Sequence, residues 1–453
     1  MSEKQLTLRN IAQWAKGTLV GEDRPIIDWA IDSRKVNKGD LFVAIRGARA
    51  DGHDFIPEIT AAGAAACVVS QPIDSALPYV LVEDTVKALG DIARKWTALC
   101  DIPVIAVTGS VGKTTTKSLM AAIMAQHHHT LATPGNFNSE IGLPLSLLKL
   151  NATHQSVVLE MGAGRRGDIA YLCDVAQPNI AVITRAAAVH VATFGSIDDV
   201  AKTKGEIYEG LRSQGVAIIN ADDPFASYWK GLVKDKTVIT FGLENKADVF
   251  ASQIQDLGLM GSDFVLHLPN GESLAIHMPF PGRHNVQNAL AAAAAAYAAE
   301  VPIQTIKQGI ERAENVGGRL QVKTVCGYQI IDDSYNANPT SLRAAIDVLS
   351  ALTGEKILVT GDMLELGPTE KEDHFNVGCY AKEKGVRSLF GYGLLSQETV
   401  RGFGEGATHY ASHDALAAAL RAMLTQQSVV LVKGSRGMKM EKVIEALAKE
   451  GTC

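Results

Sequence analysis

The chain has few of the features that mark secreted, membrane or nucleic-acid-binding proteins. Its six cysteines form no CxxC pair, a pattern typical of neither a disulfide framework nor a zinc site. It has no long basic run and a formal net charge of −6, so nucleic acid is not an expected partner. The start of the chain has no apolar core of the signal-peptide type, and the most apolar stretch, residues 288–300, is too short and too rich in alanine to span a bilayer. We expect a cytoplasmic protein with no membrane insertion.

The length and composition are those of a soluble protein with several domains. The 453 residues exceed one ordinary core, and 47% of them are apolar and 20% charged. Short apolar runs alternate with glycine-marked turns in the first part of the chain, and strands then alternate with helices. This rhythm predicts an α/β protein with parallel sheets. We expect a small N-terminal α/β domain in residues 1–82, a central parallel-sheet domain in residues 83–314 and a C-terminal Rossmann-like α/β domain in residues 315–453.

The strongest chemical signal is the stretch VTGSVGKTTTKS, residues 107–118, which stands between an apolar strand and a helix. In such a turn the backbone N–H groups and the helix N-terminus face a phosphate, Lys113 adds a positive charge and Thr114 can bind magnesium. Val107 stands where the usual pattern has its first glycine, so the loop is a shortened variant that begins at Gly109. The residues expected to bind the nucleotide phosphates are Thr108, Gly109, Ser110, Gly112, Lys113, Thr114 and Thr115.

A phosphate loop alone leaves a GTPase switch, a kinase and a ligase open. The sequence NKAD at residues 245–248 matches the NKxD pattern with which GTPases bind guanine. However, no aspartate between the loop and residue 245 is followed three residues later by glycine, so the DxxG element of a switch is missing. NKAD also follows FGLE rather than a buried strand, and we predict a surface turn there.

Two further residues are candidates for a metal site. Glu160 ends the strand segment VVLEMG, and His190 follows the next unit of the same kind. Ligand groups of α/β sheets gather at the carboxyl ends of strands, and oxygen and nitrogen groups there would suit Mg²⁺ that bridges ATP phosphates. Each residue also has an ordinary interpretation, because a strand-end glutamate is usually solvated and a single histidine is usually structural.

Several motifs together resemble the Mur ligase family. The family's TGxxGKT(T/S) loop matches residues 108–115, GRHNVQNALAAAAAA from Gly282 resembles its adenine-side helix, and GGRL with Arg319 resembles the start of its third domain. PGNFNSEIGLP, DDSYNANPTS, GDMLELG and VKGSR are similar to the branch that joins D-alanyl-D-alanine to UDP-N-acetylmuramoyl-tripeptide. The resemblance covers essentially the whole chain. It implies an ATP-dependent amide-bond-forming enzyme of the bacterial cytoplasm that makes the pentapeptide precursor of peptidoglycan.

The resemblance also implies a mechanism. ATP phosphorylates the tripeptide carboxylate, and the dipeptide amine attacks the resulting acyl phosphate. Two magnesium sites are implied, with Thr114, Glu160, His190 and Lys204 as ligands. Lys204 matches the family's lysine that reacts with CO₂ to give a carbamate, although Lys202 is close enough in sequence to keep that assignment open. The residues expected to act in catalysis are Lys113, Lys204, His190 and Glu160.

Binding residues follow from the same resemblance. Asn288 and Asp333 match the family's adenine and ribose contacts, and Arg319 matches its phosphate contact. Residues 1–82 are expected to bind the UDP-linked substrate. Ser33 and Arg34 lie in the segment that holds its UDP end in relatives, although a bare DSR segment would otherwise be a turn before a strand.

The remaining expected contacts lie in loops. Asn136 and Asn138 resemble contacts near the reacting carboxylate. The residues expected to receive the dipeptide in the third domain are Asn336, Asn338, Ser435 and Arg436. The chain departs from the family at Arg185, where relatives often have asparagine, and at Ala192, where they often have glutamate. We expect a monomer, and the third residue of the tripeptide stays open between meso-diaminopimelate and lysine.

Two alternatives stay open beside this hypothesis. A folylpolyglutamate-type ligase shares the central fold but has no need of the first domain's DSRKV and GDLFVA segments. A phosphate-loop ATPase or switch would hydrolyse nucleotide independently of any peptide, and the missing DxxG element counts against it.

Overall fold

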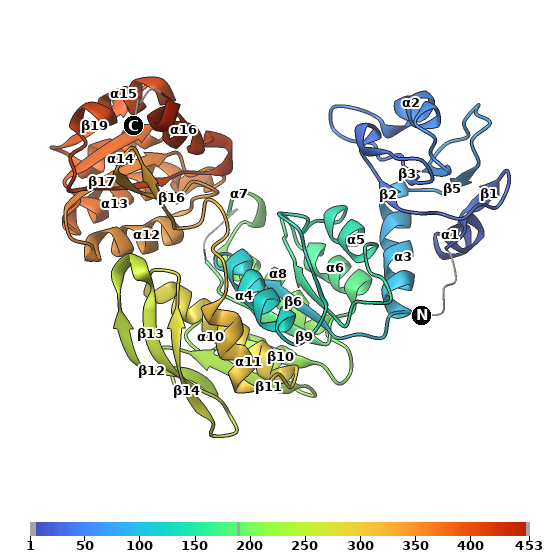
Figure 1. Ribbon diagram of the computed structural model, residues 1–453, viewed down its shortest axis with the longest axis horizontal. Coiled ribbons are helices and arrows are strands. Elements are labelled where there is room, and N and C mark those ends of the chain that lie inside the picture. Colours follow the sequence, from blue (N-terminus) through green and yellow to red (C-terminus); the bar gives the residue numbers. More distant parts are fainter. Residues whose placement is uncertain (1–5, 188–190, 450–453) are drawn as a thin grey trace.

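The computed structural model describes residues 6–187 and 191–449, and of Val191 and Ala192 only the backbone. Three sheets form three domains, and the two outer domains lie at opposite ends of the molecule (Figure 1). Five strands lie in residues 18–81, nine in residues 104–278 and six in residues 321–433. The prediction of a three-domain α/β fold is confirmed.

The N-terminal sheet has the strand order β1-β5-β4-β3-β2 and is parallel except for β1, which pairs antiparallel with β5. Its elements are α1 (Leu8–Trp14), β1 (Thr18–Val20), β2 (Trp29–Ala30), β3 (Leu41–Val43), α2 (Ile56–Ala61), β4 (Ala66–Val69) and β5 (Tyr79–Leu81). The helix α3 (Thr85–Ala98) then leads into the central domain, and the Asp84 carboxylate begins it by accepting from the N–H groups of Val86 and Lys87.

The central sheet has the order β14-β13-β12-β11-β10-β9-β6-β8-β7. Its strands are β6 (Val104–Thr108), β7 (Thr130–Ala132), β8 (Ser156–Glu160), β9 (Ile180–Ile183), β10 (Val216–Asn220), β11 (Thr237–Gly242), β12 (Val249–Asp256), β13 (Ser262–His267) and β14 (Ser273–Met278). All pairs are parallel except β12–β13 and β13–β14, which are antiparallel. The parallel part matches the expectation from the strand–helix alternation.

Helices cover both faces of this sheet. They are α4 (Lys113–Ala125), α5 (Gly142–Leu147), α6 (Asp168–Ala176), α8 (Ile197–Glu209), α9 (Ala226–Leu232), α10 (Arg283–Ala298) and α11 (Ile303–Glu311), and the short helix α7 (Val191–Phe194) packs against α8. Alternate residues of β6 enter different cores: Ala106 packs in the core that also holds α3, α6 and α8, and Val107 in the core that holds α4, α10 and α11. The alanine-rich segment 289–296 of α10 is fully buried, and its small side chains let α10 pack closely against α4.

The C-terminal sheet has the order β15-β16-β20-β17-β18-β19 and is parallel except for the β15–β16 pair. Its elements are β15 (Gln321–Val325), β16 (Tyr328–Asp333), α12 (Pro339–Ala351), β17 (Glu355–Gly361), α13 (Glu370–Glu383), β18 (Ser388–Tyr392), α14 (Ser396–Phe403), β19 (Ala407–Tyr410), α15 (His413–Met423), β20 (Ser428–Lys433) and α16 (Glu441–Lys449). The register pairs Asp333 with Lys433 at the carboxyl ends of β16 and β20, the end of a parallel sheet where ligands bind.

The helices of the described chain are short relative to a bilayer or too polar for one. None of them, in residues 6–187 and 191–449, has both the length and the hydropathy needed to cross a membrane.

Candidate active site

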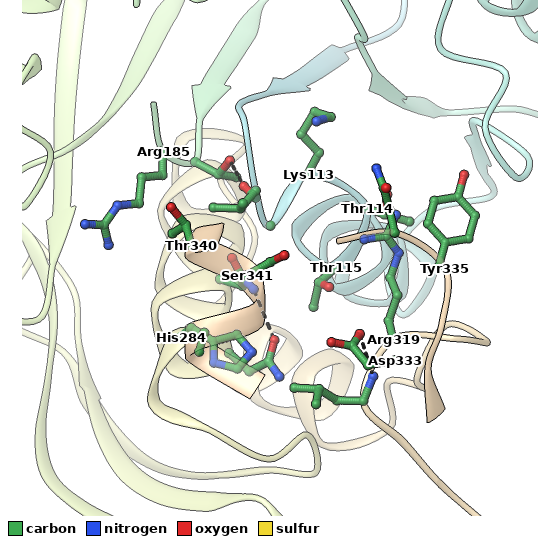
Figure 2. Close-up of a pocket in the computed structure, with 18 of the residues that line it drawn as sticks. Lys113, Thr114, Thr115, Arg185, His284, Arg319, Asp333, Tyr335, Thr340 and Ser341 are labelled. Atoms are coloured by element: carbon green, nitrogen blue, oxygen red, sulfur yellow. Dashed lines mark hydrogen bonds between the residues drawn. The ribbon is translucent and has the colours of Figure 1, made fainter. Parts of the chain in front are cut away.

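A cavity opens where the phosphate loop of the central domain faces the C-terminal domain (Figure 2). Its lining comes from the loop after β6, the first turn of α10, the linker at residues 315–320 and the segment from Asp333 to the start of α12. Of the ATP-binding residues predicted from the sequence, it brings together Ser110, Gly112, Lys113, Thr114, Thr115, Asn288, Arg319 and Asp333. Thr108 and Gly109 lead into the loop from β6.

Two glycines allow the phosphate loop its close turns. Gly112 has a φ of 81°, and a side chain there would collide with the amide oxygen of Asn288. Gly109 has a φ of 148°, and a side chain there would collide with the Thr184 hydroxyl. That hydroxyl donates to the Val111 carbonyl at 2.6 Å, which ties the loop to the end of the neighbouring strand β9. The loop thus lies tightly between Asn288 of α10 and Thr184 at the end of β9.

Lys113 begins α4, and its ammonium donates to the Gly109 carbonyl at 2.7 Å. Burial lowers the pKa of Lys113, and the nearby carboxylate of Glu160 opposes that shift. The ammonium is thus folded back over the loop whose backbone would hold a phosphate, and a bound anion would favour its charged form.

Glu160 is the centre of a short polar chain. Its side chain is almost fully buried at the end of β8. One carboxylate oxygen accepts from the Thr114 hydroxyl at 2.8 Å, and the other accepts from the Asn138 amide at 2.7 Å. Asn136 lies exposed in the same loop, and its carbonyl accepts from the backbone N–H of Asn138. The structure therefore joins one predicted metal ligand to another and to a predicted substrate contact.

Lys204 lies on the inner face of α8 with only 3% of its surface exposed. Burial, together with the charge of nearby Lys113, lowers the pKa of Lys204 from its ordinary 10.5 to about 7. Lys202, the other candidate, is 46% exposed and its ammonium lies 3.5 Å from an Asp199 carboxylate oxygen. Of the two, Lys204 lies in the interior, within electrostatic range of Lys113 and Glu160.

His190 lies outside the described residues, and so does the side chain of Ala192. Arg185 lines the cavity but is exposed, and in Figure 2 its side chain points away from Lys113 and Thr114. The prediction that His190 binds metal stays a prediction.

The C-terminal domain contributes a group of charges to the cavity. The Arg319 guanidinium lies 4.4 Å from the centre of the Tyr335 ring, and its buried Nε has no hydrogen-bond partner among the described residues (Figure 2). Asp333 accepts from the Leu320 N–H at 3.2 Å and from the Lys433 ammonium at 2.5 Å. Burial raises the pKa of Asp333, and Lys433 opposes that shift. An unpartnered guanidinium nitrogen beside a phosphate loop is a fit for an anionic ligand.

The first turn of α10 adds residues that the sequence reasoning missed. His284 and Gln287 line the cavity beside the predicted Asn288, from one face of this helix. Burial and the nearby charge of Lys433 lower the pKa of His284 to about 4. Their spacing of three and four residues places such side chains on the same helix face, so the predicted helix together with Asn288 could have indicated the other two.

Models of three Mur ligase domains match the chain: the Mur ligase family catalytic domain at residues 29–97, the Mur ligase middle domain at residues 107–296 and the Mur ligase glutamate ligase domain at residues 318–436. UDP-N-acetylmuramoyl-tripeptide–D-alanyl-D-alanine ligase of Escherichia coli is 39% identical over 99% of both chains. The chain belongs to the Mur ligase family. Among solved structures, MurF from Acinetobacter baumannii superposes with a TM-score of 0.93 at 34% identity over 99% of both chains. MurF of Thermotoga maritima in complex with ADP has a TM-score of 0.83 at 29% identity, covering 93% of this chain and 97% of that one.

The residues predicted to hold the dipeptide in this Mur ligase lie close to the nucleotide cavity. Asn336 and Asn338 line it, and Asn338 also caps α12 by accepting from the Ser341 N–H at 2.9 Å. Ser435 is buried, and its hydroxyl accepts from the Leu364 N–H at 2.8 Å. Arg436 is exposed and pairs with Glu441 at 3.0 Å. Asn338 and Ser435 thus have structural partners in addition to the role proposed for them.

Ser33 and Arg34 lie in the N-terminal domain of this Mur ligase, in a short turn whose residues do not line the cavity. The Arg34 guanidinium donates to the Asp32 carboxylate at 2.8 Å and lowers the pKa of Asp32 to about 2. Arg34 itself is 81% exposed, so its surface is open to a ligand.

The guanine-binding alternative fails on the structure. The Asp248 carboxylate of NKAD accepts from the Thr240 N–H at 2.8 Å and from its hydroxyl at 2.6 Å. The Asn245 side chain donates to the Ala221 carbonyl at 3.1 Å in an exposed turn. Both NKAD side chains therefore fix the β10–β12 region, and neither lines the nucleotide cavity.

The side chains beside the phosphate loop offer few oxygen ligands for magnesium. Among the described residues no group of three or more His, Cys, Asp and Glu side chains is arranged to hold a metal. Magnesium bound to a nucleotide needs only one or two protein oxygens, since phosphates and water supply the rest. Thr114 and Glu160 present such oxygens 2.8 Å apart beside the phosphate loop, and they fit this type of site.

Proposed function

We propose that this Mur ligase joins D-alanyl-D-alanine to UDP-N-acetylmuramoyl-tripeptide with ATP as the energy source. The observation that carries the proposal is the hydrogen-bonded chain Thr114–Glu160–Asn138, which connects the phosphate loop to the PGNFNSE loop. Relatives with this named activity that match nearly the full length of the chain support it. In this reaction the nucleotide and a carboxylate must meet, and the chain of contacts lies between the two loops.

The chemistry needs an activated carboxylate. A free carboxylate is a poor acyl donor because its leaving group is oxide. Transfer of the γ-phosphoryl group to the tripeptide carboxylate gives an acyl phosphate, which the dipeptide amine attacks to give an amide and inorganic phosphate. Two anions approach each other in the first step, so positive charge and positioning lower its barrier. Lys113 from the loop and Arg319 from the third domain both line the cavity and supply this charge.

Magnesium belongs to this proposal as a partner of ATP. When bound, it neutralises charge on the phosphate oxygens during transfer. Thr114 and Glu160 would hold it at one site. Lys204, as a carbamate, would give oxygen ligands to a second, with His190 as a further ligand. The interior position of Lys204 and its pKa of about 7 support the carbamate, because only the neutral amine reacts with CO₂.

The three domains take separate parts in the proposal. Residues 1–82 bind the UDP-linked substrate through Ser33 and Arg34, residues 83–314 bind ATP, and residues 315–453 bind the dipeptide. In this C-terminal domain Asn336 and Arg436 would contact the dipeptide, and the Arg436 guanidinium would pair with its terminal carboxylate. A cytoplasmic monomer is part of the same proposal.

Phosphate release tests the proposed function. Release from Mg-ATP is measured with UDP-linked tripeptide, carrying meso-diaminopimelate or lysine, with and without D-alanyl-D-alanine. We expect release that requires both peptide substrates and that is lost in Lys113→Ala. The exposed Lys95→Ala on α3 is the control and is expected to keep wild-type activity. Release without peptide substrates would contradict the ligase and favour an ATPase or switch.

A further inference from the structure

A buried lysine, Lys117, lies one helical turn after Lys113. Lys117 is 7% exposed, and its ammonium donates to the Thr133 carbonyl at 3.0 Å. The spacing of four residues places Lys113 and Lys117 on the same face of α4. Burying an ammonium group costs free energy of folding unless polar partners compensate it. The proposed reaction gives Lys117 no role, so the reason for its burial has to be found elsewhere.

Thr133 is the residue at which three elements meet. It follows the edge strand β7, and its N–H donates to the Val158 carbonyl of β8 at 3.0 Å. Its hydroxyl accepts from the Glu160 N–H at 3.0 Å, and its carbonyl accepts from Lys117. Thr133 therefore ties the helix of the phosphate loop to the strand that ends in Glu160.

The segment at residues 134–138 begins directly after this point. At its far end Asn138 donates to Glu160 at 2.7 Å, and the Asn138 carbonyl accepts from the Gly162 N–H at 2.8 Å. Between these two anchors the hydrogen bonds of residues 134–137 are made within the segment itself. Its position relative to Glu160 thus depends on Thr133 at one end and Asn138 at the other.

The charge of Lys117 has a second consequence for Glu160. This carboxylate lies within electrostatic range of three buried ammonium groups, those of Lys113, Lys117 and Lys204. In the proposed reaction Lys113 turns to the phosphates and Lys204 becomes an anionic carbamate. Lys117, held by a backbone carbonyl, is the one of these three whose charge and partner stay unchanged.

We propose that Lys117 is a positioning residue, which holds the segment at residues 134–138 and its Asn138 against Glu160 through the Thr133 carbonyl. This inference rests on the proposed function for its kinetic consequence only. The segment carries Asn136 and Asn138, the proposed contacts to the reacting carboxylate. Greater mobility of the segment therefore weakens binding of the UDP-linked substrate more than binding of ATP.

The test compares Lys117→Met, which keeps the aliphatic stem, with Lys117→Arg, which keeps the charge and a donor. Hydrogen exchange of the substrate-free enzyme is followed at the amides of residues 133–142 and at Gly162. We expect Lys117→Met to speed exchange there by about tenfold, since the segment opens locally without global unfolding. Lys117→Arg is expected to restore most of the protection. The exposed Lys95→Met is the matched control, with wild-type exchange.

Kinetics give the second readout. We expect Lys117→Met to raise KM for the UDP-linked tripeptide by about tenfold, the loss that follows removal of a charged hydrogen bond, with KM for ATP changed by no more than about twofold. Equal rises in both KM values, or exchange and KM values like those of Lys95→Met, would overturn the proposal. Inactive wild type with accelerated exchange in Lys117→Met would refute the proposed function and leave the positioning role supported.

A second variant covers the case in which Lys117→Met fails to fold. Lys117→Gln keeps a polar end but is shorter and carries no charge, so the Thr133 carbonyl loses the ammonium that holds it. We expect the same selective rise in KM for the UDP-linked tripeptide, since the segment loses its tie at Thr133. An unchanged KM in this variant would overturn the proposal.

Discussion

The buried ammonium of Lys204 predicts a stability that depends on pH in a defined direction. Replacing Lys204 by methionine keeps the length of the side chain and removes the charge. Below pH 7 both the folded and the unfolded wild type carry the proton, so the folded state bears the full cost of burying it. Above pH 7 the folded chain releases the proton while the unfolded chain keeps it up to about 10.5. The cost therefore falls as pH rises, and wild type gains stability relative to Lys204→Met.

The magnitude follows from the pKa of Lys204. A shift from 10.5 to about 7 corresponds to about 5 kcal/mol of cost at low pH, at about 1.4 kcal/mol per unit. Between pH 6 and pH 9 the cost decreases over two units, which is about 3 kcal/mol. Lys204→Met should thus be more stable than wild type at pH 6, and its advantage should shrink by about 3 kcal/mol at pH 9.

Urea unfolding in CO₂-free buffer at both pH values measures this difference. Lys202→Met, on the same helix but exposed, is the control and should show no comparable pH-dependent change. A stability gap between Lys204→Met and wild type that stays constant from pH 6 to pH 9 would refute the reasoning, because it would place the ammonium in water. Addition of ¹³C-bicarbonate at pH 8 should then give a carbamate NMR signal in wild type that is missing in Lys204→Met.

Two further substitutions test the cavity. Gly112→Ala forces a side chain onto a backbone with positive φ and against the amide oxygen of Asn288. The affinity for ADP, measured by calorimetry, should therefore fall by about tenfold or more. An unchanged affinity would mean that the loop can relax. Asp333→Ala leaves the 3%-exposed ammonium of Lys433 without its carboxylate and should cost about 3–5 kcal/mol of stability of the C-terminal domain, measured by denaturant unfolding. The double variant Asp333→Leu, Lys433→Met should recover most of that loss, and an equally unstable double variant would show that the pair is not the cause.

The phosphate loop could be predicted from the sequence because its chemistry lies in one continuous segment. The lysine, threonine and glycines of residues 107–118 carry the signal themselves, and Figure 1 shows the expected strand and helix around them. The same holds for α10, because the motif that indicated it lies in one continuous segment that begins at Gly282. His284 on that helix was within reach of a periodicity argument but was missed, because a single histidine carries little information on its own.

Contacts between distant segments could not be predicted in the same way. Asn138 and Glu160 are far apart in sequence, and their bond depends on the order of strands β7, β8 and β6 in the sheet. Asp333 and Lys433 are paired by the parallel register of β16 and β20, and this register cannot be derived from the sequence of either strand alone. In each case the residue types were visible, but the partner is decided by topology and register, which a local pattern does not contain.

The balance of charge around Glu160 connects these contacts to the proposed chemistry. Lys113, Lys117 and Lys204 all lie within electrostatic range of the Glu160 carboxylate, the carboxylates of Asp168 and Glu206 also act on Lys204, and burial lowers the pKa of each of the three lysines. Binding of a polyanionic nucleotide and conversion of Lys204 to a carbamate would add negative charge to this group, which would favour divalent cations there. The strain of burying Lys204 as a cation is thus the physical reason to expect its modification, and the pH experiment measures that strain directly.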